Sequence, residues 1–111
     1  MVPELLQEAS TKVAAIVVQT EQNAPRGWSY TVQVNHLDGT QTNHVVTMAW
    51  ADHEHWCGGR VAPSVVVEAV VAYVLDHRAD DSSATLLPAS FDTARARRWF
   101  PQIDEALRDS L

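Results

Sequence analysis

Residues 28–37 alternate between apolar and polar side chains, and this alternation constrains the fold more than any other feature of the sequence. Large apolar residues fall at the even positions and polar residues at the odd ones: Trp28, Tyr30, Val32 and Val34 against Ser29, Thr31, Gln33 and Asn35. A period of two is typical of a strand that buries one face. We therefore expect a sheet with one apolar face that a second layer must cover.

The segment before this strand is predicted to be its neighbour. Residues 12–21 contain a cluster of β-branched side chains, although their alanines would also permit a helix. Residues 23–27 then supply turn-forming asparagine, proline and glycine. Because a strand here would give the alternating strand a partner, we interpret residues 12–21 as a strand.

A hairpin is predicted on the other side, where Asp38-Gly39 precedes a third strand at residues 41–50. A bulged three-residue turn at 38–40, with Gly39 at positive φ, would place every large apolar side chain on one face. That turn pairs Val34 with His44, Val32 with Val46, Tyr30 with Met48 and Trp28 with Trp50.

Residues 63–77 are predicted to form a long helix that buries almost its whole circumference. Pro63 suits the first turn, and the polar residues Ser64, Glu68 and Asp76 make only a thin stripe. Three shorter helices are expected from their boundary residues: 51–57 before Gly58-Gly59, 93–100 after the N-cap residue Asp92, and 102–109 after Pro101.

The length of 111 residues fits one domain. We expect a single α+β domain over residues 1–111, in which residues 1–11 are a short helix or a frayed N-terminus and residues 80–83 a solvated loop. Its architecture is a three-stranded antiparallel β-meander followed by a long apolar helix and one or two C-terminal helices.

Charge and cysteine content argue against several classes of protein. The net charge of −6 disfavours nucleic-acid binding, which needs a basic surface. The longest apolar run, residues 65–75, contains Glu68 and is shorter than the roughly 20 residues of a membrane-spanning helix. No secretory signal is visible, and the single cysteine, Cys57, fits a reducing compartment. The expected localisation is cytoplasmic.

The run Arg95-Ala96-Arg97-Arg98, followed by Trp99-Phe100, is a local basic exception. Basic residues beside aromatic ones can hold an anion or a single nucleic-acid strand. Three arginines in an acidic chain are weak evidence for such a binding site. We interpret the run as a helix with arginines on its solvent face and aromatics on its core face.

The order of several short motifs resembles a group of small uncharacterised bacterial proteins. The resemblance covers about residues 12–105 and rests on His44-Val45-Val46-Thr47-Met48, Ala51-Asp52, Gly58-Gly59-Arg60-Val61-Ala62-Pro63 and Phe91-Asp92 … Trp99-Phe100-Pro101. The group carries an H-x-V-T-L strand, a GGRVSPEELV helix start and an FD … YFPEYE ending. It implies a β-β-β-α-α order and no known activity.

Departures from that group point to a partner subunit. Ala49 and Ala62 stand where the group has serine, so two helix N-caps are expected to be lost. Val65 and Val66 stand where it has two glutamates, and their exposure would leave about 1.5–3 kcal/mol of burial per side chain unused. We therefore expect a homodimer interface that includes Val65, Val66, Ala69 and Tyr73.

The strongest candidate for a metal-binding site is the segment His53-Glu54-His55-Trp56-Cys57. On a helix His53 and Cys57 are i and i+4 and share a face, whereas His55 points elsewhere. On an extended segment all three would share a side. With His44 or His36 they could make a zinc site if the fold brings them together. The structural alternative is a solvated helix with a small buried thiol.

Two further chemistries have weaker signals. Cys57 with His44 or His55 and Asp52 supplies the residue types of a nucleophile, base and orienting acid, but no oxyanion-hole motif accompanies them. Gly58-Gly59-Arg60 before a helix could cradle an anion, although it is much shorter than a P-loop.

The sequence therefore favours a non-enzymatic protein–protein interaction module that acts as a homodimer through the valine-rich helix or a sheet edge, with an unidentified protein as a further partner. The alternative is a metal-binding protein or metal-dependent enzyme that uses His44, His53, His55 and Cys57. No cofactor is expected apart from zinc in that alternative, and neither a membrane nor a nucleic acid is expected as a partner.

Overall fold

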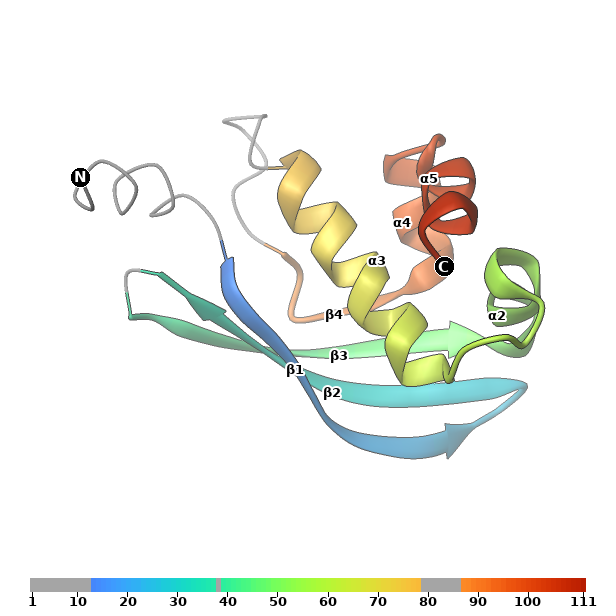
Figure 1. The fold of residues 1–111 in the computed structure, drawn as a ribbon. Helices are drawn as coiled ribbons and strands as arrows, with labels where there is room; N and C mark the ends of the chain where they lie inside the picture. The colour runs from blue at the N-terminus through green and yellow to red at the C-terminus, as the bar shows by residue number, and fades with distance from the viewer. Residues whose placement is uncertain (1–12, 38, 79–86) are drawn as a thin grey trace.

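The fold has two layers, a sheet and a set of helices that cover one of its faces (Figure 1). The computed structural model describes residues 13–37, 39–78 and 87–111, so the predictions for residues 1–11 and 80–83 lie outside the described residues. The elements in chain order are β1 (Val13–Ala24), β2 (Gly27–His36), β3 (Gln41–Ala49), α2 (Trp50–Cys57), α3 (Pro63–Arg78), β4 (Ser90–Asp92), α4 (Thr93–Trp99) and α5 (Ile103–Ser110). The predicted α+β class is confirmed.

The sheet order is β1-β2-β3-β4, and the first three strands are antiparallel as predicted. β1 continues three residues beyond the predicted end and pairs Ala24 with Gly27 across a tight turn. In this turn Arg26 adopts a φ of 58°. Gly27 then lies so close to β3 that a Cβ atom on it would be 2.2 Å from the carbonyl oxygen of Met48.

The register between β2 and β3 differs from the prediction by two residues. Val32 lies opposite His44 and Tyr30 opposite Val46. The backbone N–H of His36 donates to the carbonyl of Thr40 at 2.9 Å, so the connection spans residues 37–39 instead of 38–40. Gly39 has the predicted positive φ, at 96°. A shift of two residues keeps the same side chains on the core face, so hydrophobic alternation alone cannot detect it.

The new register also changes the position of Trp50, which the sequence places on the core face of the third strand. Gly27, the first residue of β2, pairs with Ala49, and the strand pairing ends there. Trp50 instead begins α2, and 56% of its surface is exposed.

A fourth strand, β4, is absent from the sequence-based prediction. Its three residues pair in parallel with residues 45–47 of β3, and three residues are too few to display an alternation. β4 buries Phe91 and leads directly into α4. Asp92 caps that helix as predicted, since its Oδ1 accepts from the N–H of Ala94 at 2.8 Å, while Oδ2 accepts from Thr47 Oγ1 at 2.7 Å.

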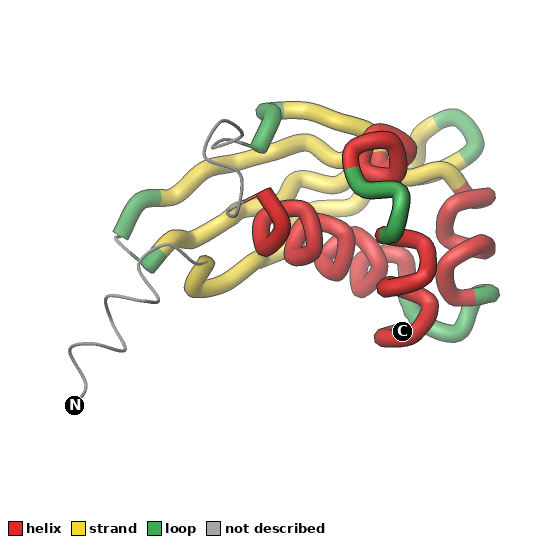
Figure 2. Tube along the Cα trace, turned by 90° about the horizontal axis from the view of Figure 1, so that it is seen from above, coloured by secondary structure: helices red, strands yellow, loops and turns green. Residues whose placement is uncertain are grey.

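The core lies between the sheet and α3. Seen from above, α3 lies along the sheet, and the shorter helices gather toward one end of it (Figure 2). Five valines of α3 have no exposed surface: Val66, Val67, Val70, Val71 and Val74. The exposed side of α3 carries Val65, Glu68, Ala72 and Asp76. Val65 therefore makes this side wider than the thin stripe predicted.

α2 ends as the sequence predicts but begins one residue earlier, at Trp50 instead of Ala51. Ala49 precedes it with no side-chain cap, and Gly58 ends it with a φ of 62° while its N–H donates to the carbonyl of Glu54. Across the described ranges, every helix is too short or too polar to cross a membrane.

Candidate functional site

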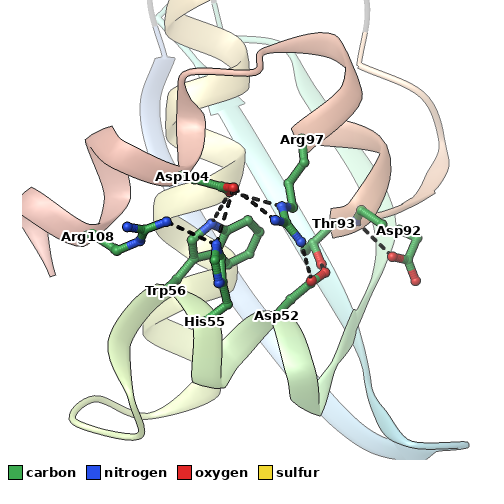
Figure 3. A network of polar contacts seen from close by, with 9 residues as sticks. Asp52, His55, Trp56, Asp92, Thr93, Arg97, Asp104 and Arg108 are labelled. Atoms are coloured by element: carbon green, nitrogen blue, oxygen red, sulfur yellow. Dashed lines mark hydrogen bonds and ion pairs between the residues drawn. The ribbon is translucent and has the colours of Figure 1, made fainter.

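A network of polar side chains joins the three short helices at one end of the molecule (Figure 3). Each helix contributes a pair of residues four positions apart, a spacing that puts both side chains on one helix face. The pairs are Asp52 and Trp56 on α2, Thr93 and Arg97 on α4, and Asp104 and Arg108 on α5. His55 of α2 lies beside them.

Arg97 is at the centre of this network, which we call the Arg97 network. Its Nε and Nη2 atoms donate to the two carboxylate oxygens of Asp104, both at 2.9 Å. Its Nη1 atom donates to Oδ1 of Asp52 at 3.1 Å. The guanidinium is planar, so the paired bonds to Asp104 fix the direction in which Nη1 reaches Asp52. One arginine thus connects α4 to both α2 and α5.

Neutral donors complete the coordination of the two carboxylates. Asp52 is a buried acid, and its Oδ2 accepts from Thr93 Oγ1 at 2.8 Å. Asp104 Oδ1 accepts from the indole Nε1 of Trp56 at 2.7 Å. Trp56 is itself buried, and the Arg97 guanidinium lies 5.9 Å from the centre of its ring, within cation–π range. All four carboxylate oxygens therefore accept a hydrogen bond.

The electrostatics agree with a mutually stabilised ion pair. The hydrogen bonds that Arg97 donates to Asp104, together with attraction to both carboxylates, raise the pKa of Arg97 despite partial burial. For Asp104, partial burial alone would raise the pKa, but hydrogen bonds from Arg97 and Trp56 and the nearby positive charge outweigh it, so its pKa is lowered. The ionised forms are the ones that the fold stabilises.

This lowered pKa predicts how Asp104 contributes to acid stability. Its contribution is complete above the unfolded-state pKa of about 3.9 and is lost as the pH falls through the lower folded-state value. Asp104→Asn should lower the free energy of unfolding by about 2 kcal/mol at pH 7, because a charged acceptor is lost. Urea unfolding of both proteins at pH 7 and near pH 2 should show that difference shrinking in acid. A difference that is constant with pH would contradict the prediction.

His55 and Arg108 form the solvent-facing rim of the Arg97 network. His55 Nε2 lies 3.3 Å from Asp104 Oδ2 and 3.1 Å from Arg108 Nη2. This nitrogen can donate to the carboxylate or accept from the guanidinium, and these roles require different protonation of the ring. The rim is exposed, and the interior of the network behind it is fully paired.

The network suits the attachment of helices better than catalysis. A general base or nucleophile needs an unpaired atom that faces a substrate. In the Arg97 network both carboxylates are fully coordinated by Arg97, Thr93, Trp56 and His55. The network therefore acts as a structural link that holds α2, α4 and α5 together.

The four predicted metal ligands lie in three different environments. His53 Nε2 and Cys57 Sγ share a helix face as predicted, but both contact the carbonyl of Val61, at 2.8 and 3.9 Å. His55 points toward Asp104. His44 is buried on β3, where Nδ1 donates to the carbonyl of Pro88 at 2.7 Å and Nε2 contacts Thr42 at 2.9 Å.

Within the described ranges, no three histidine, cysteine, aspartate or glutamate side chains come together as metal ligands. The hydrogen bond that the described residues give to Cys57 Sγ goes to the carbonyl of Val61, not to His44 or His55, the bases that a hydrolase would need. Asp52 is bound by Thr93 and Arg97 instead of by a histidine.

The predicted helix interface needs correction at one residue. Val66 is completely buried in the core of its own chain and has no surface to offer to a partner. Val65 is 43% exposed, whereas Ala69 and Tyr73 are half-buried and pack against the core. Tyr73 also stacks on His77, with ring centroids 3.8 Å apart, and meets Phe100 edge-on. The fold therefore covers most of the apolar surface that the sequence assigns to a partner.

Sequence reasoning missed the Arg97 network. It placed all three arginines of residues 95–98 on a solvent face. Arg95 and Arg98 are exposed as expected, whereas Arg97 turns inward between two carboxylates. The four-residue spacing of polar side chains on three separate helices was the available signal. It becomes informative only once the helices are known to converge.

The sheet offers a second candidate surface. All described helices lie on one face, so the opposite face has no helix over it (Figure 1). Val17 of β1 and Val45 of β3 project from that outer face, and each is 42% exposed. β1 is also an edge of the sheet, because β2 is its single neighbour among the described strands.

Comparison with protein-family models, with curated proteins and with solved structures gives no match for this chain. The functional argument therefore rests on the geometry of the Arg97 network and of the exposed sheet.

Proposed function

We propose that this chain is a small non-enzymatic protein–protein interaction module that acts as a homodimer. The cytoplasm is its proposed location, because its one cysteine, Cys57, is a buried free thiol with no intramolecular partner. The Arg97 network has the role of internal support, and the exposed apolar surface has the role of the interface.

The observation that carries this proposal is the set of large apolar side chains left on the surface. Five of them are more than two-fifths exposed: Val17, Leu37, Val45, Trp50 and Val65. Single exposed apolar residues are ordinary in soluble proteins. Here Val17 and Val45 lie together on the uncovered face of the sheet, and Val17 belongs to its edge strand. Trp50 adds a residue type that is among the most enriched at the energetic centres of interfaces.

Of the two surfaces that the sequence suggests, the sheet has the stronger support. Five valines of the valine-rich helix α3 are buried in the core of the same chain, and Val65 is the single exposed valine of this helix. The sheet keeps its outer face free of described helices, and no described strand pairs with the second edge of β1.

The proposed kinship with small bacterial proteins of the same motif order draws support from the role of each motif in the fold. His44 ties β3 to residue 88, and Gly58 and Gly59 both adopt positive φ where α2 ends. Phe91 fills the core, and Asp92 caps α4. Motifs with such roles specify a shared architecture without requiring a shared catalytic activity.

Size-exclusion chromatography with light scattering tests the proposed homodimer. At micromolar concentration the protein should elute with twice the 12.3 kDa mass of one chain. Dilution should shift the mass toward that of the monomer, because an interface of modest area dissociates measurably. A mass that stays at 12.3 kDa across this range would overturn the proposal.

A further inference from the structure

We infer that the homodimer forms by antiparallel pairing of β1 with β1 of a second copy, so that the two sheets become one continuous sheet. This inference rests on the proposed function and adds to it the interface, the partner and the symmetry. A twofold axis perpendicular to the sheet would relate the copies and leave the helices of both on the same side.

The first support is the bare edge of β1. The strand is 12 residues long, about twice the usual length of a strand, and pairs on one side with β2. Its other side presents backbone N–H and C=O groups that no other described strand uses. The opposite edge of the sheet is different, because β4 is three residues long and covers only residues 45–47 of β3. A long uncovered edge is a template for another strand.

The second support is charge. Copies of a chain with a net charge of −6 repel each other, so the contact surface with the least added repulsion is one that carries no charge itself. Residues 13–20 of β1 contain no lysine, arginine, aspartate, glutamate or proline, the residues that usually protect an edge from pairing. The first acid after them, Glu21, accepts a hydrogen bond from Tyr30 at 2.9 Å. The neutral stretch therefore suits a second copy of this chain.

The third support limits where the two strands meet. The register with β2 shifts between Val13 and Ala15 and again between Val18 and Thr20, as at β-bulges, which bend a strand and interrupt its ladder. Residues 15–18 form the regular stretch between these shifts. Because paired residues must project from the same face, the axis falls on Ile16 or on Val17.

Val17 is the large side chain of residues 15–18 that is free to contact the second copy. Ile16 and Val18 pack against the core of their own chain, while Val17 is 42% exposed on the outer face. With the axis on Val17 the two copies of this valine lie opposite each other. With the axis on Ile16 each Val17 lies opposite Ala15 of the other copy. Both arrangements place Val17 within the cross-strand contact.

Two matched lysine variants test the inference. Val17→Lys places like charges beside each other at the dimer axis, whereas Val45→Lys changes a valine of equal exposure on the same outer face of an inner strand. Light scattering and analytical ultracentrifugation should show a dimer dissociation constant raised roughly tenfold or more for Val17→Lys. Val45→Lys should dimerise like the wild type, and circular dichroism should confirm that both variants fold.

The other outcomes separate this inference from the proposed function. If both variants stay dimeric, or if both lose the dimer, pairing of β1 is overturned while the homodimer stands; the second result indicates face-to-face packing of the sheets. A wild-type monomer overturns both. Hydrogen exchange of the wild type needs no variant. Those amides of residues 15–18 that point away from β2 should become more protected as protein concentration rises, and unchanged protection of them in a confirmed dimer would contradict the pairing.

Discussion

Replacing Arg97 with methionine should lower the free energy of unfolding by about 3 kcal/mol, one of the two largest effects expected from a single substitution in this chain. The substitution keeps an unbranched apolar stem but removes all three hydrogen bonds to Asp52 and Asp104. Asp52 is buried and, of the side-chain donors that the described part of the chain gives it, would retain only Thr93. Removing one partner of such a pair costs more than the pair contributes, because a charge is left without compensation.

The neighbouring Arg98 provides the matched control. It lies on the same helix but is exposed, so Arg98→Met should change the free energy of unfolding by less than about 0.5 kcal/mol. Urea denaturation followed by tryptophan fluorescence measures both variants, and the signal includes the buried Trp56. Equal effects of the two substitutions would show that the Arg97 network does not stabilise the fold.

A triple variant distinguishes two causes of the lost stability: the missing hydrogen bonds of Arg97 and the two carboxylates left without a positive partner. Adding Asp52→Asn and Asp104→Asn to Arg97→Met removes both uncompensated carboxylates while preserving acceptors for Thr93 and Trp56. This triple variant should regain part of the stability that Arg97→Met loses, because the asparagines need no counter-charge. A further loss of stability would mean that the carboxylates themselves, and not their pairing, hold the helices.

Gly27→Ala should also lower the free energy of unfolding by about 3 kcal/mol, at the upper end of the cost of over-packing. The added Cβ would lie 2.2 Å from the carbonyl oxygen of Met48 and 2.9 Å from Cα of Ala49. Both atoms belong to the backbone of β3, so relief requires the first pair of the β2–β3 ladder to separate. Thermal unfolding followed by circular dichroism provides the measurement.

Gly59→Ala measures how much backbone strain alone lowers the free energy of unfolding, because the added Cβ would meet no other atom. No atom lies within 4 Å of the Cβ position at Gly59, but its φ of 82° is unfavourable for alanine. The expected loss is about 1 kcal/mol. If Gly27→Ala proved no more damaging than Gly59→Ala, the close approach of β2 to β3 would not be a constraint on stability.

The elements themselves followed from local pattern. Alternation identified β2, the glycine pair after Cys57 ended α2, and Asp92 marked the start of α4, all as the structure has them. These signals depend on side chains within a few positions of each other. The antiparallel order of β1 to β3 followed as well, because short turns leave few alternatives.

The errors arose where one element meets another. Hydrophobic alternation allowed two registers of the β2–β3 hairpin, and the observed one moved Trp50 from a core strand position to the surface. β4 is too short to carry a pattern and exists because residues 90–92 lie beside β3. The valines of α3 suggested a missing partner, whereas the sheet and the C-terminal helices cover five of them.

By itself the sequence determined the three long strands and the helices, which of their faces are apolar, and that β1 carries no charge over residues 13–20. These properties are local, since propensity and periodicity act through neighbouring residues. Only the tertiary structure decided that Arg97 turns inward, that the proposed metal ligands stay apart, and that β1 lies at a bare edge. Each of these depends on the convergence of chain segments up to 50 or so residues apart, and burial and long-range pairing determine that convergence.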